Sequence, residues 1–254
     1  MKVLLSPAKS LNYENEILTP QPTKANFLEE SSYLVKKLQK LSKKQLSELM
    51  HISEQLSDLN YDRYQNWVSP EVMNNNAKPA VTVFTGEVYK GLAVEDFTSE
   101  DFINAQKQLL ILSGLYGVLR PLDLMYPYRL EMGTKFEVTP KMNNLYKFWG
   151  SKIADYINSQ CEEGELIVNL ASNEYFKAVD KQKIKNRIIT PVFKELKGDK
   201  FKVIMMYAKH ARGAMAREIV KNNYTTVEEI KSYNVDGYSF SEEMSKGNEF
   251  VFIR

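Results

Sequence analysis

Residues 166–177 read Leu-Ile-Val-Asn-Leu-Ala-Ser-Asn-Glu-Tyr-Phe-Lys, an apolar run that is followed at once by polar side chains. The run at 166–170 is short, aliphatic and partly β-branched, which predicts a buried strand. Residues 2–6, Lys-Val-Leu-Leu-Ser, predict a second strand of the same kind. Helical patterns separate such strands along the chain, which indicates a mixed α/β architecture.

Further segments show patterns typical of strands, and others show patterns typical of helices. We expect additional strands at 80–84, 188–196, 201–207 and 249–253, with Gly198-Asp199 at the turn of a hairpin. We expect helices at 25–67, 98–112, 140–160, 209–222 and 226–232. No linker divides the chain, so we predict one domain over residues 1–254, with a mixed sheet surrounded by helices.

Composition excludes several classes of protein. The 254 residues are 43% hydrophobic and 26% charged, as in ordinary globular domains. No apolar run is long enough to cross a bilayer, and the run after Met1 stops too soon for a signal peptide, so we expect a cytoplasmic protein without a membrane partner. Cys161, His51 and His210 make no metal-spacing motif, and neither a P-loop nor a GxGxxG occurs. We therefore predict no metal and no cofactor.

Positive charge is concentrated between residues 177 and 221. This segment holds thirteen Lys and Arg against four Asp and Glu, a net charge of +9, whereas the whole chain carries +2. A cationic region of this kind suits an anionic partner, and nucleic acid is the commonest large anion because each neutralised phosphate releases counterions. The alternative is a solvated lysine-rich hairpin that keeps the protein soluble.

Polar side chains follow four of the predicted strands. Because the carboxyl ends of parallel strands meet at one edge of a sheet, these side chains could share one cleft. They are Ser6, Lys9, Lys90, Ser172, Glu174, Tyr175, Lys209 and Arg212. Helix starts at Ser6 and Ser172 would direct backbone N–H groups toward an anion. The alternative is that strand ends are polar because water is there.

The predicted helix at 209–222 carries two arginines in different settings. Arg212 lies at the edge of its apolar face, where a guanidinium needs an acidic partner, so it belongs either to a buried ion pair or to a binding site. Arg217 lies on the opposite face and is a candidate phosphate ligand.

Residues 112–123, Leu-Ser-Gly-Leu-Tyr-Gly-Val-Leu-Arg-Pro-Leu-Asp, follow a helical pattern and resemble a helix-hairpin-helix element. The glycine turn of that element offers backbone N–H groups to DNA phosphates. Its candidates here are Gly114, Tyr116, Gly117 and Arg120. Ser113 stands where proline is usual, and Tyr116 adds a residue between the glycines. The alternative is a glycine C-cap followed by a tight turn.

Several motifs occur in a fixed order: Ser6-Pro7-Ala8-Lys9, Gly86-Glu87-Val88-Tyr89, the run 112–125, Pro127-Tyr128-Arg129-Leu130-Glu131-Met132-Gly133, the run 169–176, and Tyr207-Ala208-Lys209 with Ala211-Arg212-Gly213. With these motifs the chain resembles the YaaA family of bacterial peroxide-stress proteins (UPF0246, DUF328). The resemblance implies an uncommon compact α/β fold and a cytosolic protein that lowers damage from free iron. It also implies DNA binding through a positively charged cleft with a helix-hairpin-helix element, to which Arg129 is added as a candidate.

The sequence thus predicts binding to the phosphate backbone of DNA with little sequence specificity. The alternative is an enzyme that acts on a nucleotide, nucleobase or damaged DNA. Glu174 would then be the general acid or base beside Tyr175 and Lys9, and a nucleotide-like small molecule would be a partner. Cys161 is a poor candidate for a peroxide sensor, because Glu162 and Glu163 would raise the pKa of its thiol.

Overall fold

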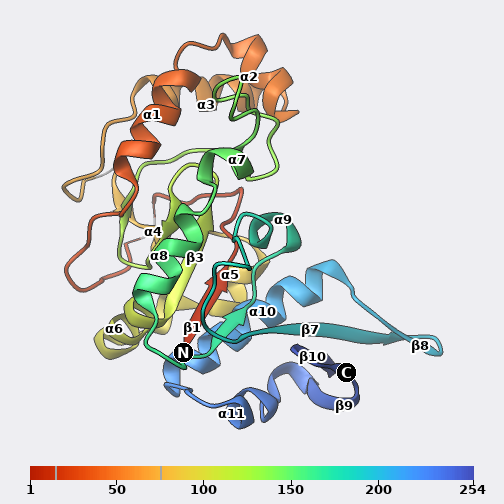
Figure 1. Cartoon of the computed structure of the whole chain (residues 1–254). Helices are drawn as coiled ribbons and strands as arrows, with labels where there is room; N and C mark the ends of the chain where they lie inside the picture. Colours follow the sequence, from red (N-terminus) through yellow and green to blue (C-terminus); the bar gives the residue numbers. More distant parts are fainter. Residues whose placement is uncertain (15, 75) are drawn as a thin grey trace.

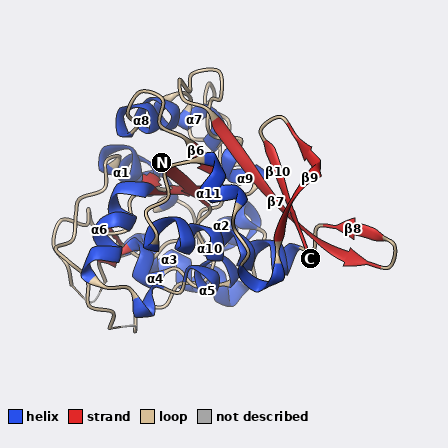
Figure 2. Cartoon of the chain, turned by 90° about the horizontal axis from the view of Figure 1, so that it is seen from below, coloured by secondary structure: helices blue, strands red, loops and turns tan. Residues whose placement is uncertain are grey.

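The computed structural model describes residues 1–14, 16–74 and 76–254. In this part of the chain an eight-stranded mixed sheet runs in the order β4-β3-β1-β6-β7-β10-β9, with β8 paired to β7 (Figures 1 and 2). The strands are β1 (Lys2–Leu5), β3 (Leu109–Ser113), β4 (Gly117–Leu119), β6 (Ile167–Asn169), β7 (Ile188–Lys197), β8 (Lys200–Lys202), β9 (Ser239–Lys246) and β10 (Glu249–Ile253). The mixed α/β class and the surrounding helices confirm the sequence prediction.

The central strand β1 is parallel to both of its neighbours, β3 and β6. Val3, Leu4 and Leu5 are fully buried, as is every residue of β6. Strands that are covered on both faces are expected to read as continuous apolar runs, which explains why these segments lack the alternation of a half-exposed strand.

Helices cover the sheet, and some of them lie beyond one end of it. They are α1 (Leu28–Leu38), α2 (Lys43–Met50), α3 (Glu54–Gln65), α4 (Ala80–Val83), α5 (Glu87–Leu92), α6 (Ser99–Gln108), α7 (Leu145–Trp149), α8 (Lys152–Gln160), α9 (Asn173–Phe176), α10 (Met205–Lys221) and α11 (Val227–Lys231). Two short 3-10 turns, η1 (Val94–Asp96) and η2 (Val235–Gly237), and the small β2–β5 pair (Lys78–Pro79 with Leu124–Met125) complete the fold. Helices α1 to α3 lie together at one end of the molecule (Figure 1). No helix in the described ranges is long and apolar enough to cross a membrane.

A ribbon of two strands projects from the body. The outer half of β7 leaves the sheet and pairs with β8 in an antiparallel hairpin, which we call the arm (residues 194–202). Figures 1 and 2 show the arm reaching away from the helices. Its lysines Lys197, Lys200 and Lys202 are exposed, as is Leu196.

Helices α5 and α10 cross with almost no side chain between them. A Cβ atom on Gly213 would lie 1.7 Å from the carbonyl oxygen of Val88, and one on Gly91 would lie 2.1 Å from the carbonyl oxygen of His210. Both positions therefore require glycine because the backbones touch. Gly213 is therefore a point where α10 approaches another helix closely.

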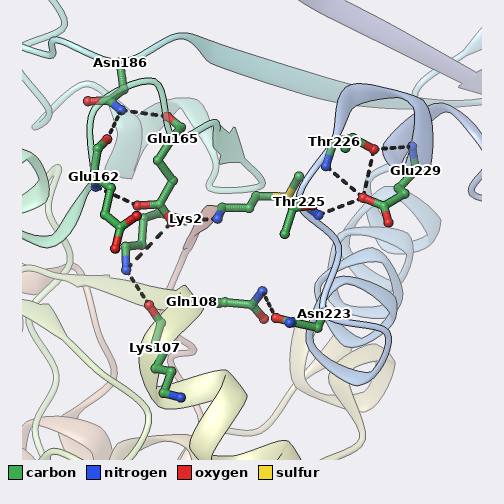
Figure 3. Close-up of polar contacts among 11 residues, drawn as sticks. Lys2, Lys107, Gln108, Glu162, Glu165, Asn186, Asn223, Thr225, Thr226 and Glu229 are labelled. Atoms are coloured by element: carbon green, nitrogen blue, oxygen red, sulfur yellow. Dashed lines mark hydrogen bonds and ion pairs between the residues drawn. The ribbon is translucent and has the colours of Figure 1, made fainter.

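Polar contacts fix the amino end of β1 (Figure 3). The Lys2 ammonium donates to the carbonyl oxygen of Lys107 at 2.7 Å and lies 3.9 Å from Glu165. The Asn186 side-chain amide donates to the carbonyl oxygens of Glu162 and Glu165. These contacts tie the amino ends of β1, β6 and β7 together.

Three predicted elements are wrong. Residues 80–84 are mostly helical, because Ala80–Val83 form the buried helix α4 despite their β-branched content. The helix expected at 98–112 ends at Gln108, and Leu109–Ser113 form β3 in the middle of the sheet. The strand expected at 201–207 ends at Lys202, because the helix-favouring Met205 begins α10.

The helix-hairpin-helix expectation is also wrong. Ser113 pairs with Gly117 in an antiparallel β-hairpin formed by β3 and β4, and the residues between them make the turn. A short apolar run such as 109–113 cannot be assigned to strand or helix by periodicity alone, which explains the error.

Candidate functional site

The carboxyl ends of β1 and β6 meet at two serines. The backbone N–H of Ser172 donates to the Ser6 hydroxyl at 2.8 Å, and the two hydroxyl oxygens lie 3.3 Å apart. From β1 the chain proceeds to β3 on one side of that strand and later to β6 on its other side. In open α/β sheets, ligands bind where the strand order reverses in this way, outside the carboxyl ends of the strands.

Lys9, three residues beyond Ser6, reaches a carboxylate on another segment. Its ammonium lies 2.6 Å from Oε2 of Glu131, and the Arg129 guanidinium lies 3.3 Å from Oε1 of the same group. One carboxylate is therefore shared by two cations. Lys9 is mostly exposed, whereas Arg129 is largely buried. The Tyr64 hydroxyl donates to the carbonyl oxygen of Arg129 and fixes this segment from α3.

Glu174, two residues beyond Ser172, is tied to the same segment as Lys9. The Gly133 N–H donates to Oε1 of Glu174 at 2.8 Å, and the Tyr146 hydroxyl donates to the Glu174 carbonyl oxygen at 3.1 Å. A Cβ on Gly133 would lie 3.0 Å from this carboxylate oxygen, so glycine permits the contact. The segment 129–133 thus links the strand-end residues of β1 to those of β6.

Buried tyrosines form the floor of this region. Burial raises the pKa of Tyr89, Tyr128 and Tyr175 above the ordinary phenol value, so all three stay neutral at physiological pH. The Tyr89 hydroxyl donates to the Ser6 carbonyl oxygen at 3.1 Å. The residues around the resulting pocket, which we call the motif cleft, are Pro7, Ala8, Lys9, Tyr128, Arg129, Leu130, Glu131 and Tyr175.

Comparison with known proteins places the chain in a family. The model of the family described as peroxide stress protein YaaA matches residues 1–244. A UPF0246 protein of Saccharophagus degradans is 52% identical, with 100% of this chain and 99% of that protein covered. UPF0246 proteins of Flavobacterium psychrophilum and of a Shewanella species are 47% and 44% identical, again over at least 99% of each chain. The chain belongs to the YaaA family.

Three of the motifs that carry the YaaA resemblance converge on the motif cleft, although they are far apart in sequence. Ser6-Pro7-Ala8-Lys9 touches both the 127–133 motif and the 169–176 motif through the contacts above. The motif at 86–89 joins them through Tyr89. Sequence reasoning selected Arg129 from the 127–133 motif but missed Glu131 and Gly133. The sequence did mark them, because Glu131 is a charged residue between two apolar ones and Gly133 follows directly.

Lys90 and Lys209 lie next to this cleft rather than in it. Lys90 is 2.7 Å from Glu87 at the start of α5. The hydrogen bond from Lys90 lowers the pKa of Glu87, and His210 and Lys209 lower it further, which places all four groups close together. Lys209 is therefore near the motif-bearing start of α5, although it stands in a helix and not at a strand end.

The two arginines of α10 have different environments. Arg217 donates to the carbonyl oxygens of Leu92 and Ala93 and lies 2.5 Å from Asp96, so its guanidinium is occupied in holding α10 to η1. Arg212 is half-buried, and burial lowers its pKa. Among the described residues it has no carboxylate partner, so the ion-pair alternative is wrong within that part of the chain.

The glycine-turn candidates lie inside the protein. Gly114, Tyr116 and Gly117 are buried, and the Tyr116 hydroxyl accepts from Trp67 Nε1 and from the Tyr126 N–H, each at 3.0 Å. Arg120 is 3.1 Å from Asp123 in the following turn. The predicted presentation of this turn to phosphate is therefore not found, because packing against the helices covers it.

The cations of residues 177–221 are mostly without acidic partners. Among the described residues, only Arg217 and Lys221 lie within 4.0 Å of a carboxylate. Lys177 and Lys181 instead lie over the rings of Tyr146 and Phe176. The exposed members are Lys177, Lys181, Lys183, Lys185, Arg187, Lys197, Lys200, Lys202 and Lys209. We call these nine side chains the cationic surface.

Proposed function

We propose that this YaaA-family protein binds DNA through the phosphate backbone, with little sequence specificity. The observation that supports the proposal is the cationic surface, whose nine members have no carboxylate partner among the described residues. Surface lysines that are already paired gain little from a new anion, whereas unpaired ones release counterions from DNA when they meet phosphate. The arm carries three of these lysines away from the body of the protein, where the phosphate backbone of DNA can reach them.

We propose further that DNA binding limits iron-dependent oxidative damage in the bacterial cytoplasm. Cations condensed on DNA are released when protein lysines neutralise the phosphates. Ferrous iron held on the backbone as a counterion would be displaced with them, so that the radical formed from peroxide arises away from the DNA. This route requires no metal ligand on the protein.

A binding titration against two unrelated duplexes over a range of salt concentrations tests the DNA proposal. The logarithm of the affinity should fall linearly with the logarithm of salt, with a slope of about −0.9 for each phosphate contacted, and the duplexes should bind alike. A flat salt response or strong discrimination between the duplexes would rule it out. Nicking of plasmid DNA by ferrous iron and peroxide, with and without saturating protein, tests the protective step.

A second candidate is an enzyme that acts on a nucleotide, nucleobase or damaged DNA. It is favoured by Lys9 and Tyr175, which line one pocket near the reversal of strand order, and by Glu174, which precedes Tyr175 in the chain. Glu174 would serve as the acid or base. Nuclease and glycosylase assays with Glu174→Gln as the control test it, and equal turnover by both forms would exclude this role.

A further inference from the structure

The motif cleft contains a carboxylate that neutralises only one of two neighbouring cations. Glu131 lies 2.6 Å from Lys9 and 3.3 Å from Arg129, and it is partly buried. The second carboxylate nearby, Glu174, is directed to the Gly133 N–H at 2.8 Å. Lys9 and Arg129 therefore depend on a single shared acid, and a more highly charged anion would neutralise them better.

Arg129 also has a donor that the protein does not satisfy. Its Nε atom is buried and has no hydrogen-bond partner among the described residues, although the side chain lines the cleft. A buried donor without an acceptor costs free energy, so such groups call for an explanation. A guanidinium presents its N–H groups in a planar fork that matches two oxygens of a carboxylate or phosphate. An oxyanion bound at this guanidinium would supply an acceptor that the described residues do not.

The position of the cleft is the one expected for a ligand. It lies beyond the carboxyl end of β1, beside the Ser6–Ser172 pair where the strand order reverses. The cleft holds a cavity of about 10 Å³, enough for one water, so an oxyanion can enter only when the Glu131 carboxylate moves out. The neutral Tyr128 and Tyr175 line it.

We propose that the motif cleft binds a phosphate monoester, and that the Lys9–Glu131 pair is a latch which opens when the phosphate takes the place of the Glu131 carboxylate. A phosphate monoester carries a charge of about −1.5 to −2 and three acceptor oxygens, so it can replace a carboxylate of charge −1 on two cations. The phosphate belongs either to a free nucleotide or to the 5′ end of a DNA strand. This inference is independent of binding along the DNA backbone.

Titration calorimetry with inorganic phosphate and with AMP tests the latch. Lys9→Ala removes the exposed cation and should weaken binding of both probes at least tenfold. Glu131→Gln removes the competing charge and should tighten binding several-fold. Lys24→Ala is the matched control, because Lys24 has a similar side-chain exposure, 62% against 61%, and pairs with Glu71 at 3.3 Å away from the cleft. It should bind as the wild type does.

Two comparisons separate the sources of the phosphate. Tighter binding of AMP than of inorganic phosphate would assign a free nucleotide. Tighter binding of a 5′-phosphorylated oligonucleotide than of its 5′-hydroxyl counterpart, lost in Lys9→Ala but kept in Lys24→Ala, would assign a DNA end. The inference is overturned if neither wild type nor Glu131→Gln binds any of the probes, or if Lys9→Ala binds them as wild type does. Backbone DNA binding can survive either of these results, so the two proposals fail separately.

Discussion

The backbone N–H of Ser172 donates a hydrogen bond of 2.8 Å to the hydroxyl of Ser6, although the two residues are 166 positions apart. This contact joins two motifs that are far apart in sequence but follow neighbouring parallel strands, β1 and β6. Each serine follows a buried parallel strand, so the sheet itself fixes their separation. The proposed phosphate site lies next to this junction.

The lysines of the arm should set part of the salt dependence of DNA binding. Replacing Lys197, Lys200 and Lys202 by alanine should lower the slope by about 0.9 for each lysine that contacts a phosphate. The matched control replaces Lys36, Lys40 and Lys44, which are exposed on and near α1 and α2. Fluorescence anisotropy at several salt concentrations measures both. Equal slopes for the two triple variants would show that the arm lysines do not contact DNA phosphates.

Arg212→Ala should weaken DNA binding while changing stability little. Arg212 has no carboxylate partner among the described residues, so its loss strands no buried acid. We expect the free energy of unfolding to change by less than about 1 kcal/mol, against about 3–5 kcal/mol for a broken buried pair. Urea unfolding and a DNA titration on the same variant give the two numbers. Unchanged DNA affinity would exclude Arg212 from the interface.

Cys161 should react slowly and should be dispensable. Burial, with a smaller contribution from Glu165, raises the pKa of its thiol to about 11. At pH 7 about one thiol in ten thousand is then ionised. Alkylation by iodoacetamide should be slow at pH 7 and should accelerate as the pH rises toward 11, which mass spectrometry can follow. Rapid alkylation at pH 7, or loss of peroxide protection in Cys161→Ser, would contradict this reading.

The Asp96–Arg217 contact should give a small, pH-dependent stabilisation. The hydrogen bond from Arg217 lowers the pKa of Asp96. The contribution is therefore present above the unfolded-state value, about 3.9, and is lost as pH falls through the lower folded-state value. Because Asp96 is well exposed, Asp96→Asn should cost under about 1 kcal/mol at pH 7. Urea midpoints of the two proteins should converge as the pH falls below the folded-state pKa of Asp96, and a constant difference would show that the charge is not the cause.

Gly213→Ala should destabilise the protein by at least about 2 kcal/mol. The added Cβ would meet the Val88 carbonyl oxygen at 1.7 Å, so α5 and α10 would have to move apart. Lys209→Ala, at an exposed position on the same helix, should stay within about 0.5 kcal/mol of wild type. Thermal and urea unfolding measure the stability of both variants. Equal stability would show that the crossing of α5 and α10 accommodates the added Cβ easily.

Local signals were enough to predict much of the fold. Helices α2 and α6 both begin with a capping box, which depends only on residues three positions apart (Ser42–Gln45 and Thr98–Asp101). β1, β6 and β10 were predicted from their apolar runs. β3 was missed because Leu109–Ser113 continues a helical pattern without a break, and only pairing with β1 makes it a strand.

The site was predicted in part. Eight side chains at strand ends were expected in one cleft. Ser6 does contact Ser172, and Lys9 and Tyr175 line one pocket. Lys90, Lys209 and Arg212 are not among the residues around that pocket. Strand order decides which neighbours they have, and that order is a property of long-range pairing that no local pattern encodes. Glu131 was missed for this reason, since its role depends on contacts with Lys9 across 122 positions of the chain.

The crossing of α5 and α10 has a mechanical consequence. Helix α10 starts where the arm ends, and α5 starts beside the cleft, with the Tyr89 hydroxyl on the Ser6 carbonyl oxygen. Side-chain layers between helices normally absorb small displacements by changing rotamers, but at Gly91 and Gly213 backbone meets backbone. A shift of α10 at this crossing would therefore require a matching shift of α5, whose Tyr89 contacts Ser6 beside the cleft.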